Sequence, residues 1–172
     1  MKKLSIKICC RSLRSTKKLA ELFALNSKKG DLILLSGDLG TGKTTFTQSY
    51  IRKLINDDKY IVNSPSYVLD NTYKLEDNSC IHHIDLYRLP QNCQLDILGI
   101  PEIFEEGYTI IEWPERVDIS IFLKYNPILI TFQPTKSYRN IILNAFNELS
   151  INKINRICES LEINKLVRTK LK

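Results

Sequence analysis

With 172 residues, the chain is long enough for one α/β domain with a hydrophobic core and short for two. Its 43% hydrophobic and 26% charged residues are ordinary for a globular protein and exclude a mainly disordered chain. No run approaches the roughly 18 uninterrupted apolar residues that a membrane-spanning helix needs. Lys7, Arg11 and Arg14 interrupt any signal-peptide core, so we expect a cytoplasmic protein without a membrane segment.

The formal net charge of +6 is unevenly distributed along the chain. Residues 1–30 carry nine Lys or Arg against one Glu, and residues 148–172 carry six against three acidic residues. Residues 31–147 have the opposite balance, with ten basic and fifteen acidic residues. Basic ends around an acidic middle suit RNA or an acidic protein partner, although solvated helix faces produce the same pattern.

The first predicted element is a helix that Ser15 or Thr16 caps at its N-terminus. Its apolar residues recur at helical spacing and are Leu19, Leu22, Phe23 and Leu25. Lys28 and Lys29 would occupy its last turn and Gly30 would follow it, which is the chemistry expected where a helix stops.

The next segments predict a strand, a glycine-rich loop and a second helix. The apolar run at residues 32–35 is too short for a helix and suits a strand buried on both faces of a parallel sheet. After the loop, apolar side chains recur at helical spacing, so we expect a helix from Thr44 to about Asn56.

The sequence after the second helix predicts mainly strands and few helices. A turn at residues 63–66 contains Pro65, which disfavours helical angles at the residue before it. Strands are predicted over residues 67–75, 80–87, 108–113, 127–132 and 139–146. A weak helix is expected over residues 91–98, ended by Gly99, and a helical tail follows Glu148.

Residues 37–44, GDLGTGKT, form a complete Walker A pattern between the predicted buried strand and helix. Its three glycines let successive amides point into one concavity, which opens onto the positive end of a helix dipole. Lys43 would neutralise β- and γ-phosphate oxygens, and the Thr44 hydroxyl would coordinate Mg²⁺. The residues expected to hold the nucleotide are Leu39, Gly40, Thr41, Gly42, Lys43, Thr44, Thr45 and Trp113.

A site of this kind also needs an acidic partner for the metal and the attacking water. Asp85 and Glu112 each end a predicted strand, at the sheet edge where such sites gather their ligands. One carboxylate would hold Mg²⁺ directly and the other would position water or bind the metal through it. Spacing does not decide which is which. The neighbouring His82 and His83 face opposite sides of a strand, so we interpret them as structural.

Trp113 follows Glu112, and its ring can be interpreted either as an anchor in the core or as a ring beside the bound nucleotide.

Together, the predicted helices and strands indicate an α/β, P-loop NTPase-like three-layer sandwich with a mixed, mostly parallel central sheet. We expect a P-loop ATPase domain over residues 1–147 and a basic helical extension over residues 148–172 that packs on that domain or trails from it.

Four strings in fixed order resemble the TsaE (YjeE) family of bacterial ATPase subunits that support threonylcarbamoyl modification of tRNA. They are GDLGTGKTTF at residues 37–46, SPSY at 64–67, HIDLYR at 83–88 and IEWPER at 111–116. The resemblance runs from about Thr16 to Arg139, which is most of the chain.

This resemblance implies ATP in the loop, with Mg²⁺ held by Thr44 and Glu112. It implies that Asp85 is needed for hydrolysis, at or near the metal, that Lys43 acts with it, and that Trp113 lies near the nucleotide. Ser64 and Ser66 would occupy the hydroxyl positions of a switch-like loop, where the family usually has threonine at the second position. Thr41 replaces the usual alanine.

Family members hydrolyse ATP slowly alone and act on the TsaD–TsaB protein complex, which modifies tRNAs that read codons starting with A. The resemblance thus implies a tRNA partner only indirectly, through that complex. Two alternatives remain on the residues alone. One is a small-molecule kinase, although the arginines are scattered and no lid cluster is evident. The other is a nucleotide-gated scaffold with negligible turnover.

Overall fold

A computed structural model describes residues 3–91, 93, 101–104, 107–163 and 167–170. Its strands are β1 (Leu4–Cys10), β2 (Leu32–Ser36), β3 (Asp70–Lys74), β4 (Cys80–Asp85), β5 (Tyr108–Glu112), β6 (Ile128–Pro134), β7 (Arg139–Ala145) and β8 (Val167–Lys170). Its α-helices are α1 (Leu13–Leu25), α2 (Lys43–Ile55) and α3 (Glu148–Ile163). Short 3₁₀ helices span Pro101–Phe104 (η2), Pro114–Arg116 (η3) and Ile119–Tyr125 (η4). The helix expected over residues 91–98 lies outside the described residues.

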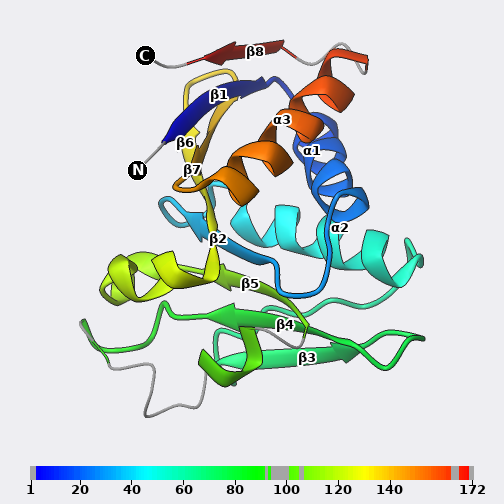
Figure 1. The fold of residues 1–172 in the computed structure, drawn as a ribbon, viewed down its shortest axis with the longest axis vertical. Helices are drawn as coiled ribbons and strands as arrows, with labels where there is room; N and C mark the ends of the chain where they lie inside the picture. Colours follow the sequence, from blue (N-terminus) through cyan, green and yellow to red (C-terminus); the bar gives the residue numbers. More distant parts are fainter. Residues whose placement is uncertain (1–2, 92, 94–100, 105–106, 164–166, 171–172) are drawn as a thin grey trace.

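All eight described strands belong to one sheet, in the order β3-β4-β5-β2-β6-β7-β1-β8 (Figure 1). The central strands β4, β5, β2 and β6 are parallel, and the outer pairs are antiparallel. Helices α1, α2 and α3 share a hydrophobic core with one face, while η2 and η4 pack on the other. The predicted fold class, a three-layer sandwich around a mixed, centrally parallel sheet, is confirmed.

Strand β2 is the centre of this arrangement because it has parallel neighbours on both sides. Its residues Leu32, Ile33, Leu34 and Leu35 are all buried, and they alternate between the cores on the two faces. Such a strand must be apolar throughout, which is why the continuous run in the sequence identified it correctly. The loop that leaves its carboxyl end is therefore held by a central strand that is buried on both faces.

Helix α1 starts and ends earlier than predicted. Its cap is Ser12, whose hydroxyl accepts a hydrogen bond from the Ser15 amide, while the Ser15 hydroxyl accepts one from the Ser12 amide. This reciprocal capping box uses Ser15 as the partner of the cap. At the other end, the Asn26 side chain donates to the Leu22 carbonyl and closes the helix before the two lysines expected in its last turn.

Strands β1 and β8 were not predicted. In the sheet, β8 is an edge strand and β1 lies between β7 and β8. In β1 the inward side chains are Ile6, Ile8 and Cys10, an alternation that suits a strand with one buried face. The helical tail expected after Glu148 corresponds to α3, which contacts α1 and β7. The chain then returns as β8 and pairs with β1, so the two basic ends of the sequence meet in the sheet. In the described part of the chain, no helix is long and apolar enough to cross a membrane.

The core beneath the glycine-rich loop contains a chain of three aromatic rings. Phe46, in the first turn of α2, meets Phe23 and Phe132 edge to face at centroid distances of 5.6 and 5.9 Å. Because Phe46 is completely buried, these rings fix α2 between α1 and β6.

Replacing Phe46 with Ala should lower the free energy of unfolding by about 3–5 kcal/mol, because the substitution leaves a cavity where the three rings meet. Leu25→Ala is the matched control, since Leu25 is 63% exposed and its loss should change stability by less than about 0.5 kcal/mol. Urea denaturation of both variants measures the difference. Equal effects of the two substitutions would contradict this description of the core.

Candidate functional site

The glycine-rich loop joins the end of β2 to the start of α2. Its glycines Gly37, Gly40 and Gly42 have φ angles of 136°, 74° and 109°, a region that side chains of other residues rarely enter. A Cβ atom at Gly37 would also lie 2.7 Å from the Phe132 carbonyl oxygen in β6. From β7, Arg139 donates a hydrogen bond of 3.0 Å to the Thr41 carbonyl, which braces the loop from outside.

The side chain of Lys43 folds back over this loop. Its ammonium donates hydrogen bonds to the carbonyl oxygens of Gly37 and Asp38, at 2.5 and 2.9 Å. It also lies 3.7 Å from the centre of the Trp113 ring, a cation–π contact. Burial lowers the pKa of Lys43, and the nearby Glu112 carboxylate opposes that shift. The lysine is thus a buried cation held at the inner side of the loop.

Trp113 follows β5 with a left-handed backbone (φ 62°), and its amide donates to the Leu35 carbonyl. Its ring packs against Tyr87 with a centroid distance of 4.8 Å, in addition to its contact with Lys43. The ring thus packs against the hydrophobic core on the η4 side of the sheet and also lies beside the loop lysine. Its position next to a bound nucleotide stays a prediction.

Glu112 ends β5 and is almost completely buried, with 2% of its side chain exposed. One carboxylate oxygen accepts a hydrogen bond of 2.9 Å from the Thr44 hydroxyl. The other lies 3.2 Å from the Thr47 hydroxyl and 3.0 Å from Nε2 of His83. The carboxylate consequently joins strand β5 to β4 and to the first turns of α2.

Sequence reasoning missed Thr47 and the contact that His83 makes with Glu112. Thr47 lies three residues after Thr44, so both hydroxyls occupy the same face of α2, and this spacing was a usable signal. His83 was read as structural and is fully buried, whereas His82 bonds to Asp70 on the other face of the sheet. The two histidines do not share one site, as expected from their adjacency.

Asp85 lies next to Glu112, because the two residues are paired in the register of β4 and β5. One of its carboxylate oxygens accepts a short hydrogen bond from the Ser66 hydroxyl, and the other accepts one of 2.9 Å from the Tyr87 amide. The Ser64 hydroxyl lies 2.8 Å from that of Ser66. The segment SPSY is therefore tied to Asp85, whereas Glu112 is tied to Thr44.

These groups surround a cavity of about 310 Å³ at the carboxyl edge of the sheet. The twelve residues that the sequence identified all line it, together with Tyr87: Leu39, Gly40, Thr41, Gly42, Lys43, Thr44, Thr45, Ser64, Ser66, Asp85, Glu112 and Trp113. A second hollow of about 500 Å³ shares the outer side of the loop and reaches the β6–β7 turn at residues 134–139.

A glycine-rich loop between a buried parallel strand and a helix, facing two strand-end carboxylates, defines a P-loop NTPase-like α/β protein. Comparison with known proteins is more specific. The profile of the family described as threonylcarbamoyl adenosine biosynthesis protein TsaE matches residues 10–141. The chain belongs to the TsaE family.

Relatives include proteins named tRNA threonylcarbamoyladenosine biosynthesis protein TsaE from several bacteria. The Haemophilus influenzae protein is 35% identical over 144 residues, which cover 83% of this chain and 88% of that protein. The Rickettsia felis protein is 42% identical, but the match spans 59% of this chain and only 58% of the relative. The crystal structure of Bacillus subtilis YdiB superposes with a TM-score of 0.69 at 27% identity, covering 96% of this chain and 99% of YdiB.

The loop geometry predicts a difference between two glycine substitutions. Gly37→Ala should destabilise the protein by about 2 kcal/mol or more, because the new Cβ would strike the Phe132 carbonyl and the backbone angle is strained. At Gly40 the new Cβ would have no atom within 4 Å, so Gly40→Ala should destabilise the protein through backbone strain alone. Thermal or urea denaturation compares them, and a larger loss for Gly40→Ala would contradict the role of the close approach at Gly37.

Proposed function

We propose that this chain binds ATP with Mg²⁺ in the cavity at residues 37–45 and hydrolyses it slowly on its own. We further propose that this cycle serves tRNA threonylcarbamoyladenosine formation by acting on the TsaD–TsaB complex. The observation that carries the proposal is the buried Glu112 carboxylate, bonded to the Thr44 hydroxyl at the edge of the glycine-rich loop. The family relationship supports the tRNA pathway.

The loop fits a polyphosphate in charge and in shape. Its left-handed glycines leave room for a ligand to approach the backbone, and open space lies beside Gly40. The Lys43 ammonium donates hydrogen bonds to two backbone carbonyl oxygens, and charged phosphate oxygens would be stronger acceptors for it. Helix α2 begins directly at this point, so its positive end faces the proposed phosphates.

The residues around Glu112 also fit Mg²⁺, because hydroxyl and carboxylate oxygens are its usual protein ligands. Thr44 and Glu112 would hold the ion, since their oxygens already lie 2.9 Å apart at the cavity. Bound there, Mg²⁺ would supply charge neutralisation to phosphate oxygens. Thr47 and His83 would orient the carboxylate from behind, leaving the Thr44 side toward the ligand.

Asp85 would act on the water that attacks the terminal phosphate. Its oxygens accept hydrogen bonds from Ser66 and from the Tyr87 amide, which fix the carboxylate at the cavity wall. A positioned carboxylate can orient water and accept its proton. Because Ser66 belongs to the SPSY segment, movement of that segment would reposition Asp85. The proposed switch-like loop, which contains Ser64 and Ser66, would therefore act on the reacting groups through Asp85.

The charges at the cavity support slow ATP hydrolysis by the chain in the absence of a partner. Among the described residues that line it, Lys43 is the sole cation, and no arginine is present. Phosphoryl transfer is accelerated strongly when an additional arginine stabilises the charge that develops on the transferred group. We therefore infer that a partner protein completes the site.

Replacing the two carboxylates should have different effects, one on ATP binding and the other on turnover. Glu112→Ala should weaken Mg²⁺-dependent ATP binding by about tenfold or more, as expected when a metal contact is removed. Asp85→Ala should retain binding but slow turnover by about a hundredfold or more. Calorimetry measures binding and single-turnover phosphate release measures hydrolysis. Glu76→Ala, an exposed carboxylate in the β3–β4 hairpin, is the control. Equal Mg·ATP affinity of the Glu112 and Asp85 variants would contradict these roles.

Partner stimulation has a direct test. Phosphate release by the wild-type chain should rise when the purified TsaD–TsaB complex is added, and the Asp85→Ala variant should not respond. Equal rates with and without the complex would contradict the proposal. Transfer of phosphate to a small hydroxyl compound rather than to water would favour a kinase instead.

A further inference from the structure

The uneven charge of the sequence has a structural counterpart away from the glycine-rich loop. Residues 1–30 and 148–172 carry the excess of Lys and Arg, and the fold brings these segments together. Helix α1 contacts α3, and β1 pairs with β8 (Figure 1). The described parts of the two basic ends therefore lie together on one side of the molecule, although they are far apart in the chain.

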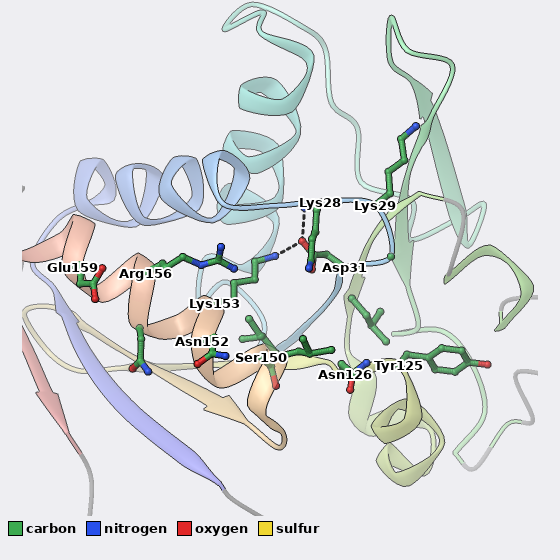
Figure 2. A pocket seen from close by; sticks show the side chains of 15 residues that line it. Lys28, Lys29, Asp31, Tyr125, Asn126, Ser150, Asn152, Lys153, Arg156 and Glu159 are labelled. Carbon is green, nitrogen blue, oxygen red and sulfur yellow. Dashed lines mark hydrogen bonds and ion pairs between the residues drawn. The ribbon is translucent and has the colours of Figure 1, made fainter.

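A cavity of about 710 Å³ lies on this side, larger than the cavity at the glycine-rich loop (Figure 2). It is bounded by residues 28–32, which lead into β2, by the start of β6 and by the polar face of α3. Since residues 28–31 precede β2 and the glycine-rich loop follows it, the two cavities lie at opposite ends of the same strand. Both can be occupied at once.

Three cations, Lys28, Lys153 and Arg156, gather in this cavity, and Asp31 and Glu159 are the acidic residues of its lining. Lys153 and Arg156 extend from α3 toward the loop that carries Lys28 and Asp31 (Figure 2). The Lys153 ammonium, on a residue only 5% exposed, makes a short ion pair with Asp31. The same Asp31 oxygen accepts the Lys28 amide at 2.6 Å. Asp31 is thus already engaged by Lys153 and by the backbone.

Glu159 offsets part of the remaining positive charge, and the lining keeps an excess of basic over acidic residues. Within the described residues, the side chains of Lys28 and Arg156 make no hydrogen bond or ion pair, and both residues are exposed. Burial lowers the pKa of Lys153, Asp31 opposes this, and the charges of Arg156 and Lys28 lower it further. Lys29 is not part of this group, because it pairs with Asp77 at 3.1 Å. An anion in the cavity would relieve the repulsion among the three cations.

We propose that this cavity binds the phosphate backbone of RNA, with Lys28 and Arg156 contacting phosphates above the buried Lys153–Asp31 pair. Arginine and lysine are the usual phosphate-binding residues. The amide side chains of Asn126, Asn152 and Asn155 also line the cavity and can bond to phosphate or sugar oxygens. The chain would then touch its RNA directly as well as through a protein complex.

RNA fits this lining better than an acidic protein does. A stable protein interface has an apolar, well-packed centre within a polar rim. Here the exposed large apolar side chain of the lining is Leu149, and the rest of the accessible lining is mostly basic or amide. A cationic, amide-rich hollow is typical of backbone recognition in nucleic acids. The membership in a family named for tRNA modification supports the same choice.

The test measures binding of a fluorescently labelled tRNA transcript by anisotropy over a range of salt concentrations. Saturating Mg·ATP is included, which keeps terminal phosphates of the RNA from occupying the glycine-rich loop. The double variant Lys28→Ala, Arg156→Ala should lose affinity by about tenfold, and its salt slope should fall by about one for each phosphate contact removed. Lys53→Ala, Lys59→Ala removes the same charge from the α2 end and should change affinity by less than about twofold.

Lys153 is left unchanged in these variants, since removing it would take away the ion-pair partner of Asp31. Both replaced side chains are exposed, and thermal denaturation should give the wild-type transition. Basal ATP hydrolysis should also be unchanged, which separates this proposal from that of the ATP site. The proposal is overturned if the wild type does not bind the transcript, or if the control variant loses as much affinity. It is also overturned if polyglutamate binds through the same side chains and RNA does not.

Discussion

A carboxylate that is 98% shielded from water would be costly unless its oxygens were hydrogen-bonded, and Glu112 is in that position. Its partners come from two elements: Thr44 and Thr47 from α2, and His83 from β4. The position of β5 relative to the first turns of α2 is therefore fixed at the edge where the glycine-rich loop opens. Removing any of these partners would leave a buried oxygen less well satisfied and would disturb the geometry of the site.

The two carboxylates at this edge of the sheet are bonded to different parts of the protein. Glu112 is bonded to the helix that follows the loop, whereas its neighbour Asp85 is bonded to Ser66 in the SPSY segment. A ligand that changes the SPSY segment would act first on Asp85 and leave the Thr44–Glu112 pair in place. The opposite end of β2 carries the cationic cavity, so nucleotide and RNA would bind to different ends of one buried strand.

The sequence predicted the features that depend on neighbouring residues. The Walker A pattern, the buried run of β2, and the carboxylates at the ends of β4 and β5 are all local signals. Features that depend on distant partners were missed. Strand β1 pairs with β7 more than a hundred residues away, and β8 pairs with β1 across nearly the whole chain. The contact of His83 with Glu112 and that of Lys153 with Asp31 follow from packing, which no spacing rule shows.

The central claim is that Thr44 and Glu112 hold one metal ion together. A double-mutant cycle with Thr44→Val and Glu112→Gln tests it, using calorimetric ATP affinities with Mg²⁺ and with a chelator. If both oxygens bind the same ion, the Mg²⁺-dependent part of the affinity should be lost in either single variant, and the double variant should lose little more. Additive losses, or equal affinities with and without Mg²⁺ in the wild type, would contradict the account.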